Sequence, residues 1–304
     1  MHEPKNLYFE YETHIASSDD TISLWVAEPQ TSKTQKIINW DSSLVPSSKY
    51  TDDNGNKISY YEFKNENTID LRITLTTTLW KRKFEHESNK SNEALPRGDR
   101  VFYTREETFL EQTPFIKQLA NELTQGVIDP IKKISIFFNY TKENFSYIYP
   151  VENRGVSHLH LSNLQGDCAE YAGFFVALCR SVGVPARNIT GYVINEQQPS
   201  EHGWASVYID AAGWVDLDPQ YASIEQNVNY FLETPDYRLA FIKGFNIPLS
   251  PHIPNDFSFQ YWIKQGLPVT HASSQILQPL VFASKKECSF TEKYNVRVLP
   301  RLAH

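Results

Sequence analysis

Residues 161–220 read LSNLQGDCAEYAGFFVALCRSVGVPARNITGYVINEQQPSEHGWASVYIDAAGWVDLDPQ, and they are the most informative part of the chain. Within it, Gly-Asp-Cys at residues 166–168 opens an apolar helix that the pattern predicts over residues 167–182. Asp167 can cap the first turn with its carboxylate, which leaves Cys168 in that turn. Unpaired N–H groups there favour a thiolate, so a lowered pKa is expected for Cys168. A rigid, activated thiol at a helix tip suits a nucleophile.

Two strands after this helix supply a base and an acid. The strand GWASVYI follows His202, the strand WVDLD ends at Asp218, and the turn between them predicts an antiparallel hairpin. Side chains alternate along a strand, so a turn with an odd number of residues places Asp218 opposite Trp204 and diagonal to His202. Asp216 has the same parity and is the rival acid. The hairpin can therefore bring a carboxylate to the imidazole of His202.

The motifs GDCAEYAGFFVALCRSVGVPAR, GY, HGWASVYI and GWVDLDP together resemble the transglutaminase-like superfamily. The resemblance implies the papain-like order of nucleophile, base and orienting acid, here Cys168, His202 and Asp218. It also implies attack on an amide carbonyl, a thioester intermediate, and release to an amine (crosslinking) or to water (deamidation or hydrolysis). The implied partners are a protein or peptide substrate and an amine acceptor, and no cofactor is expected.

The oxyanion of such a reaction needs a donor besides the backbone N–H of Cys168. Animal transglutaminases use a Trp upstream of the nucleophile, but no Trp lies between residues 81 and 203. Upstream polar side chains and one aromatic residue beside the base are the candidates for oxyanion or substrate contacts: Gln165, Asn163, Tyr147, Tyr149 and Trp204.

The whole chain is expected to be of the α+β class. An N-terminal β-sandwich precedes a papain-like, transglutaminase-like core, in which the cysteine helix packs on an antiparallel sheet with the histidine and the aspartate. Alternating and β-branched runs in residues 7–80 predict the strands of the sandwich, and residues 84–99 resemble a linker. Helical patterns follow at 107–126 and 129–145, and the tail contains the strand candidates FSFQYW, PLVFAS and YNVRVL. The expected domains are residues 1–100 and residues 101–304. A β domain before the catalytic core also resembles bacterial transglutaminase-like proteins.

Composition excludes several classes of protein. The 304 residues have a formal charge of -7 and contain no basic block, so nucleic acid is not an expected partner. No apolar run approaches the roughly 18 residues that a membrane span needs. Residues 1–15 lack the basic and apolar regions of a signal peptide, and a chain whose leader has been removed would look the same. The compartment stays open, with a secreted or periplasmic location favoured slightly over a cytoplasmic one.

The same residues allow other interpretations. The three cysteines are too few for a disulfide scaffold, and Cys179 and Cys288 are expected to be core residues. Cys, His and Asp are also zinc ligands, and His158 and His160 lie nearby in sequence, but no paired ligand spacing is present and no metal is expected. The alternative functions are a cysteine protease with the same triad and a catalytically silent binding module.

Overall fold

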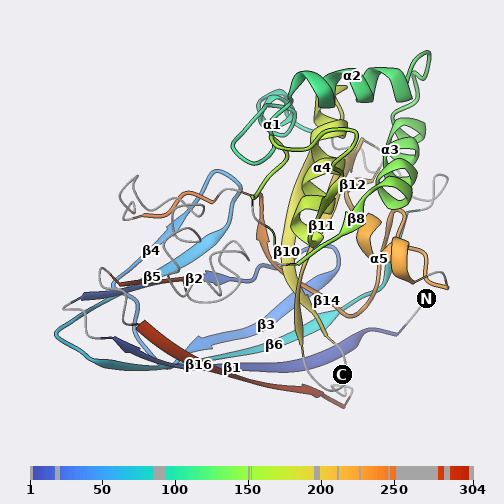
Figure 1. Ribbon diagram of the computed structural model, residues 1–304. Coiled ribbons are helices and arrows are strands. Elements are labelled where there is room, and N and C mark those ends of the chain that lie inside the picture. Colours follow the sequence, from blue (N-terminus) through green and yellow to red (C-terminus); the bar gives the residue numbers. More distant parts are fainter. Residues whose placement is uncertain are drawn as a thin grey trace.

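The computed structural model describes residues 3–17, 21–84, 94–149, 151, 153–194, 199–210, 212–225, 227–245, 247–250, 280–283 and 288–300. Two sheets of long strands form one part, and a group of helices packed on a third sheet forms the other (Figure 1). The predicted α+β class, with an N-terminal β-sandwich followed by helices packed on an antiparallel sheet, is confirmed. In the described residues, none of the helices has the length and apolar character that crossing a membrane requires.

The sandwich consists of two four-stranded sheets, with strand orders β16-β1-β6-β3 and β15-β2-β5-β4. Burial alternates along β6, as expected for a strand with one face in a core. The shared core contains Leu7, Phe9, Leu24, Tyr61 and Leu75. Its strands are β1 (Lys5–Ser17), β2 (Thr21–Glu28), β3 (Gln35–Ser42), β4 (Ser48–Thr51), β5 (Lys57–Lys64), β6 (Thr68–Leu79), β15 (Leu280–Ala283) and β16 (Cys288–Val298).

The last two strands of the chain complete the N-terminal sheets. Strand β16 pairs with β1 along its whole length, from Leu7 opposite Val298 to Ser17 opposite Cys288, and β15 pairs with β2. By their hydrogen bonds, β15 and β16 belong to the sandwich. The predicted division at residue 100 assigns them to the second domain. The strand candidate FSFQYW lies outside the described residues.

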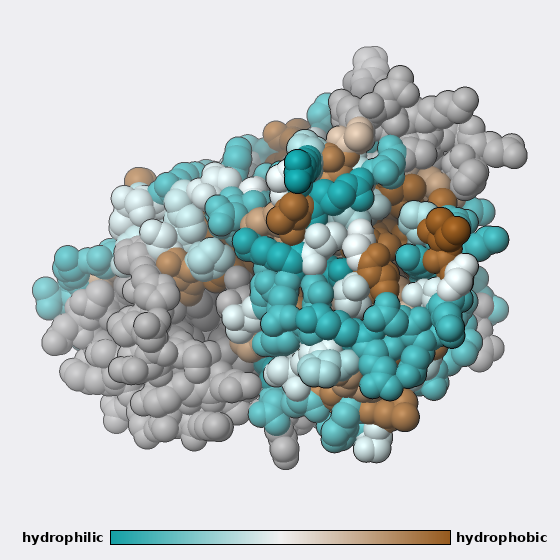
Figure 2. All heavy atoms as spheres, turned by 90° about the horizontal axis from the view of Figure 1, so that it is seen from above, coloured by the Kyte–Doolittle hydropathy of each residue, from teal (hydrophilic) through white to brown (hydrophobic). Residues whose placement is uncertain are grey.

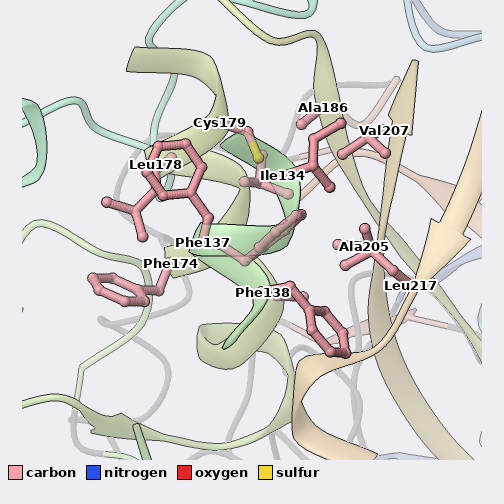
Figure 3. Close-up of a cluster of buried hydrophobic side chains, with 14 of the residues drawn as sticks. Ile134, Phe137, Phe138, Phe174, Leu178, Cys179, Ala186, Ala205, Val207 and Leu217 are labelled. Carbon is pink, nitrogen blue, oxygen red and sulfur yellow. The ribbon is translucent and has the colours of Figure 1, made fainter. Parts of the chain in front are cut away.

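The second part is built around α4, which packs on the antiparallel sheet β12-β11-β10-β14. Figure 3 shows part of this core, with Phe137 and Phe174 on the helices and Val207 and Leu217 on the sheet. Its larger elements are α2 (Pro114–Leu123), α3 (Pro130–Asn144), α4 (Cys168–Ser181), β10 (Ala186–Val193), β11 (Ser200–Ile209), β12 (Gly213–Leu217) and β14 (Arg238–Lys243). Its shorter elements are β7 (Arg82–Lys83), α1 (Arg97–Phe102), β8 (Ser146–Tyr147), β9 (Gln165–Gly166), α5 (Pro219–Ile224) and β13 (Glu233–Thr234).

Helix α3 begins as the sequence predicts, whereas α2 begins at Pro114 and not at residue 107, because a proline disfavours the helical conformation in the residue before it. Asp129 accepts a hydrogen bond from the N–H of Ile131 in front of Pro130, and Thr113 does the same for Ile116 in front of Pro114. The face seen from above in Figure 2 is mostly hydrophilic among the described residues, with apolar side chains in separate groups. The helical layer therefore presents a solvated outer surface.

The two parts share a core. Tyr192 and Phe241, from β10 and β14, pack on Phe9 of β1 with ring centroids 5.1 and 6.2 Å apart. The buried side chain of Gln35 adds two hydrogen bonds of 2.8 Å to the backbone of Ala240. The sheet of the core is thus fixed on the sandwich.

Candidate active site

The N-terminus of α4 is held by a capping box. Asp167 accepts a hydrogen bond from the N–H of Ala169 at 2.8 Å, and Glu170 accepts one from the N–H of Asp167 at 3.3 Å. A Cβ atom on Gly166 would lie 2.3 Å from Cβ of Glu170, so only glycine fits before the cap. This arrangement fixes Cys168 as the first residue of the helix.

A buried arginine stabilises the two acids of this cap. Arg154 places Nη1 2.6 Å from Asp167 and 2.6 Å from Glu170, and all three side chains are buried. Glu170 also accepts a hydrogen bond from the N–H of Gly155. Burial and the charge of Asp167 raise the pKa of Glu170 to about 8. The cluster has two acids for one arginine, so it favours keeping a proton on Glu170.

The thiol of Cys168 is half-buried, and its Sγ accepts the N–H of Gly203 at 3.4 Å. Burial raises the pKa of Cys168 above its ordinary value, and the nearby carboxylate of Asp167 adds to this effect. The Gly203 N–H and Arg154 act in the opposite direction but are outweighed. The expected lowering of this pKa is therefore wrong, because the loss of solvation exceeds the effect of the helix terminus. The resting group is a thiol.

His202 and Asp218 form a buried pair, with Nε2 of His202 2.7 Å from Oδ2 of Asp218. The hairpin register explains the contact. Ile209 pairs with Gly213 across a turn that holds an odd number of residues, and the strand pairing continues to Ala205 opposite Leu217. The next position puts Asp218 beside Trp204 and diagonal to His202, which is the geometry that the strand parity predicts.

Asp218 has two further partners. Arg238 at the start of β14 places Nη2 2.5 Å from its Oδ2, and the N–H of Tyr221 donates to Oδ1 at 2.9 Å. Burial acts to raise the pKa of Asp218, but His202, Arg238 and these hydrogen bonds outweigh it and hold the pKa below its ordinary value. Asp218 is therefore a carboxylate, and the proton between it and His202 resides on Nε2.

The imidazole of His202 is neutral at neutral pH and fixed in orientation. Burial lowers its pKa, Arg238 adds to this effect, and Asp218 opposes it. The ring packs edge-on against Tyr221 at 4.6 Å and is stacked with Trp204 at 6.1 Å. Because Nε2 is bound to Asp218, Nδ1 is the nitrogen that can accept a proton from a thiol.

Gly203 brings the histidine and the cysteine together. It directly follows His202, donates its N–H to Sγ of Cys168, and packs on the start of α4. A Cβ atom on Gly203 would lie 3.5 Å from Cα of Ala169, an ordinary van der Waals distance, so the strand already runs in close contact with the helix tip.

The structure separates the five candidates for oxyanion or substrate contacts. Tyr147 lies in β8, paired in parallel with β9, and burial together with the neighbouring Cys168 raises its pKa to about 12. Tyr149 and Gln165 are exposed, and Asn163 is half-buried in a turn that its N–H closes on His160. Trp204 is buried against His202. Tyr147 pairs with Gly166, two residues before Cys168, so it is the candidate that strand pairing brings near the thiol.

The remaining sequence candidates lie elsewhere. Asp216 pairs across from Ser206 and lines a pocket with Arg187. His158 is half-buried, with its pKa lowered by burial, and His160 is exposed. Within the described ranges, no three His, Cys, Asp or Glu side chains are placed to hold a metal ion. Cys179 is buried in the core, and the side chain of Cys288 lies outside the described residues.

Sequence reasoning missed Arg238, Tyr221 and Arg154. Tyr221 could have been inferred, because Asp218-Pro219 is a helix start whose third residue donates to the capping acid. Arg238 and Arg154 lie in segments without regular periodicity, so no local pattern indicates their partners.

Comparison with known proteins identifies the core. Residues 117–219 match the model of the transglutaminase-like superfamily. This part of the chain belongs to that superfamily. The match spans the helix with Cys168 and the strands up to Asp218, as the sequence motifs predict.

Two curated relatives align with the same region. A protein-glutamine gamma-glutamyltransferase from Pseudomonas aeruginosa (strain PAO1) is 29% identical over 156 residues, which are 45% of this chain and 23% of the relative. The uncharacterised protein YebA from Bacillus subtilis (strain 168) is 27% identical over 126 residues, 34% of this chain and 17% of the relative. The aligned segment spans less than a quarter of either relative.

Solved structures support the fold as a whole. A protein from Cytophaga hutchinsonii, proposed to be a cysteine protease, superposes with a TM-score of 0.66 at 14% identity, over 100% of this chain and 93% of that one. The β-sandwich and the transglutaminase-like core therefore occur together in another protein. The periplasmic domain of TgpA from Pseudomonas aeruginosa gives a TM-score of 0.43 at 17% identity, over 72% of this chain and 76% of that one. A similarity at that score says nothing about function.

Proposed function

We propose that the protein is a cysteine-dependent acyltransferase or hydrolase that acts on amide groups of proteins or peptides. The supporting observation is the joint placement of Cys168, His202 and Asp218. The thiol accepts the N–H of the residue after His202, and Asp218 holds the imidazole through Nε2. A nucleophile, a base and an orienting acid in this relation are the elements of a cysteine hydrolase site.

In the first step, Nδ1 of His202 accepts the proton of Cys168 as Sγ attacks the carbonyl carbon. The carbonyl oxygen becomes an oxyanion, and the imidazolium is stabilised by the carboxylate of Asp218. His202 then returns the proton to the departing nitrogen, and the C–N bond breaks to leave a thioester on Cys168. The thiol of Cys168 and the imidazole of His202 are both neutral at rest. The charges on sulfur and on the imidazolium therefore form only as the reaction proceeds.

Two donors are proposed for the oxyanion. The N–H of Cys168 stands in the first turn of α4, where backbone N–H groups have no partner within the helix. The hydroxyl of Tyr147 is the second, because this side chain is half-exposed and interacts electrostatically with Cys168. Its raised pKa keeps the phenol protonated and able to donate.

The acceptor that resolves the thioester distinguishes the activities. An amine gives a crosslink, as the name of the Pseudomonas relative indicates for that protein, and water gives deamidation or cleavage. We favour glutamine side chains as substrates on the strength of this relative, with peptide cleavage by the same triad as the second candidate. A secreted or periplasmic location stays a prediction.

The decisive experiment supplies a labelled primary amine and a glutamine-rich protein such as casein, and follows the products by mass spectrometry. We expect amine incorporation, or a gain of one mass unit at glutamine residues, that is absent with Cys168→Ala. Internal peptide cleavage in the wild type alone would instead assign the protein as a protease. If neither the wild type nor Cys168→Ala forms any product, the catalytically silent module is favoured.

A further inference from the structure

A pocket lies on the face of the core sheet that contains His202 and Asp218, farther along the strands. It has a volume of about 300 Å³ and is closed on its other side by residues 30–35, which lead into β3. Its lining includes Arg187, Tyr208 and Asp216, which have the same strand parity as His202 and Asp218. This volume is at the small end of the range for ligand sites.

The pocket concentrates positive charge in a chain whose formal charge is -7. Four cationic side chains and one carboxylate are among its described lining residues: Lys33, Arg82, Arg187, Lys243 and Asp216. Among the ion pairs of the described residues, none joins one of these four cations to a carboxylate. The positive charge is therefore not balanced by direct partners in the part of the chain that is described.

The cations are held in place by other groups. Arg82 donates to the carbonyl oxygens of Trp214 and Ala212 at 2.6 and 3.0 Å, and Lys33 donates to Ala212 at 2.8 Å. The guanidinium of Arg187 lies over the ring of Trp214, 3.8 Å from its centre. These contacts preorganise the charges without neutralising them.

Lys243 shows that the charges repel one another. Burial lowers its pKa to about 8, the neighbouring Arg187 adds to this effect, and Asp52 opposes it. Burial also lowers the pKa of Arg187. A site whose own cations are destabilised in its empty form gains free energy when an anion enters.

We propose that this pocket binds a small molecule that carries a phosphate or several carboxylate groups. Guanidinium and ammonium groups on four elements, namely the loop before β3 and the strands β7, β10 and β14, converge on it, which suits an anion with several oxygens. The ligand would link the sandwich to the sheet that holds the catalytic pair. Because Asp216 precedes Asp218 by two residues, the ligand would lie roughly 7 Å farther along the strand, outside the position of the substrate amide.

The test is calorimetric titration of the wild-type protein with inorganic phosphate and with citrate at pH 7, with sodium chloride as the control salt. We expect saturable heat with at least one of the two probes and a concentration-dependent rise in melting temperature. The probe that binds more tightly distinguishes a phosphate ligand from a polycarboxylate. Absence of saturable heat with both probes at millimolar concentration would overturn the proposal.

Three variants refine the test. Lys243→Gln should weaken binding about tenfold or more, since a hydrogen bond to a charged group is lost. Lys33→Gln should also weaken it, and this side chain is exposed and makes one hydrogen bond, to the backbone of Ala212, so the melting temperature of the variant serves as its folding control. Lys36→Gln removes the same charge from an exposed position on β3 outside the pocket and should leave binding unchanged. If anion binding weakens equally in all three variants, the effect comes from net charge alone. That result would contradict a specific binding site in the pocket. The titration requires no turnover, so its failure would leave the proposed function untouched.

Discussion

Arg238 and Asp218 are joined through the same carboxylate oxygen that receives Nε2 of His202, at an Nη2 to Oδ2 distance of 2.5 Å. The guanidinium is buried, and it lies over the ring of Tyr221, 4.2 Å from its centre. It holds the carboxylate ionised and the imidazole neutral, since it lowers the pKa of both Asp218 and His202. In the proposed mechanism, Arg238 is thus a positioning residue that acts through Asp218.

The first prediction concerns Arg238→Gln. Loss of the guanidinium leaves the buried carboxylate with less compensation and should cost about 3 to 5 kcal/mol of stability in urea unfolding. The pKa of His202 should rise without the arginine, so the acid limb of the pH–rate profile should move to higher pH. Arg238→Lys, which keeps the charge, should restore the position of that limb in part. A profile that does not move in either variant would reduce Arg238 to a purely structural role.

The second prediction separates the base from the orienting acid. His202→Ala removes the proton acceptor, and Asp218→Asn removes only its support, so Asp218→Asn should retain more activity. Asp218→Asn should nevertheless be the less stable of the two, because it leaves Arg238 buried without a counter-charge. Activity assays and urea unfolding on both variants measure this. Equal losses of activity would argue against the division of roles.

The third prediction concerns the reactivity of the thiols. With His202 in place, iodoacetamide at neutral pH should label Cys168 much faster than Cys179 and Cys288. In His202→Ala, labelling of Cys168 should slow and should increase only as the pH approaches the raised pKa of the isolated thiol. Peptide mass spectrometry over time gives the rate at each cysteine. Cys168→Ala should fold with nearly wild-type stability, and slow labelling at an equal rate on all three cysteines would support the silent module.

The fourth prediction concerns the cluster at the helix tip. The pKa of Glu170 is raised to about 8 in the folded protein, so the folded state holds a proton that the unfolded state has released. Between about pH 4.5 and pH 8, the stability of the wild type should therefore fall relative to Glu170→Gln, and above that range the difference should be constant. Urea unfolding of both proteins at intervals of pH measures the difference. A difference that does not change with pH would contradict a protonated Glu170.

Local patterns predicted the parts of the site that depend on local structure. The capping acid places Cys168, and strand alternation places Asp218 beside His202 once the turn is known to hold an odd number of residues. The sequence did not indicate the pKa of Cys168, because tertiary packing around the helix tip determines its solvation. Arg238 also escaped prediction, since its contact depends on β14 pairing with β10, far apart in sequence.

The pairing of β16 with β1 was equally hidden, although both segments were predicted as strands. Tyr11 lies opposite Tyr294, and a sequence pattern does not specify a partner at that distance along the chain.

This pairing also sets the order of events when the protein is made. The sheet β16-β1-β6-β3 cannot be completed before residues 288–298 emerge from the ribosome. One edge of β1 therefore stays unpaired while the whole second part of the protein is synthesised. The core is in effect an insertion within the sandwich, and it can assemble while that edge is still open.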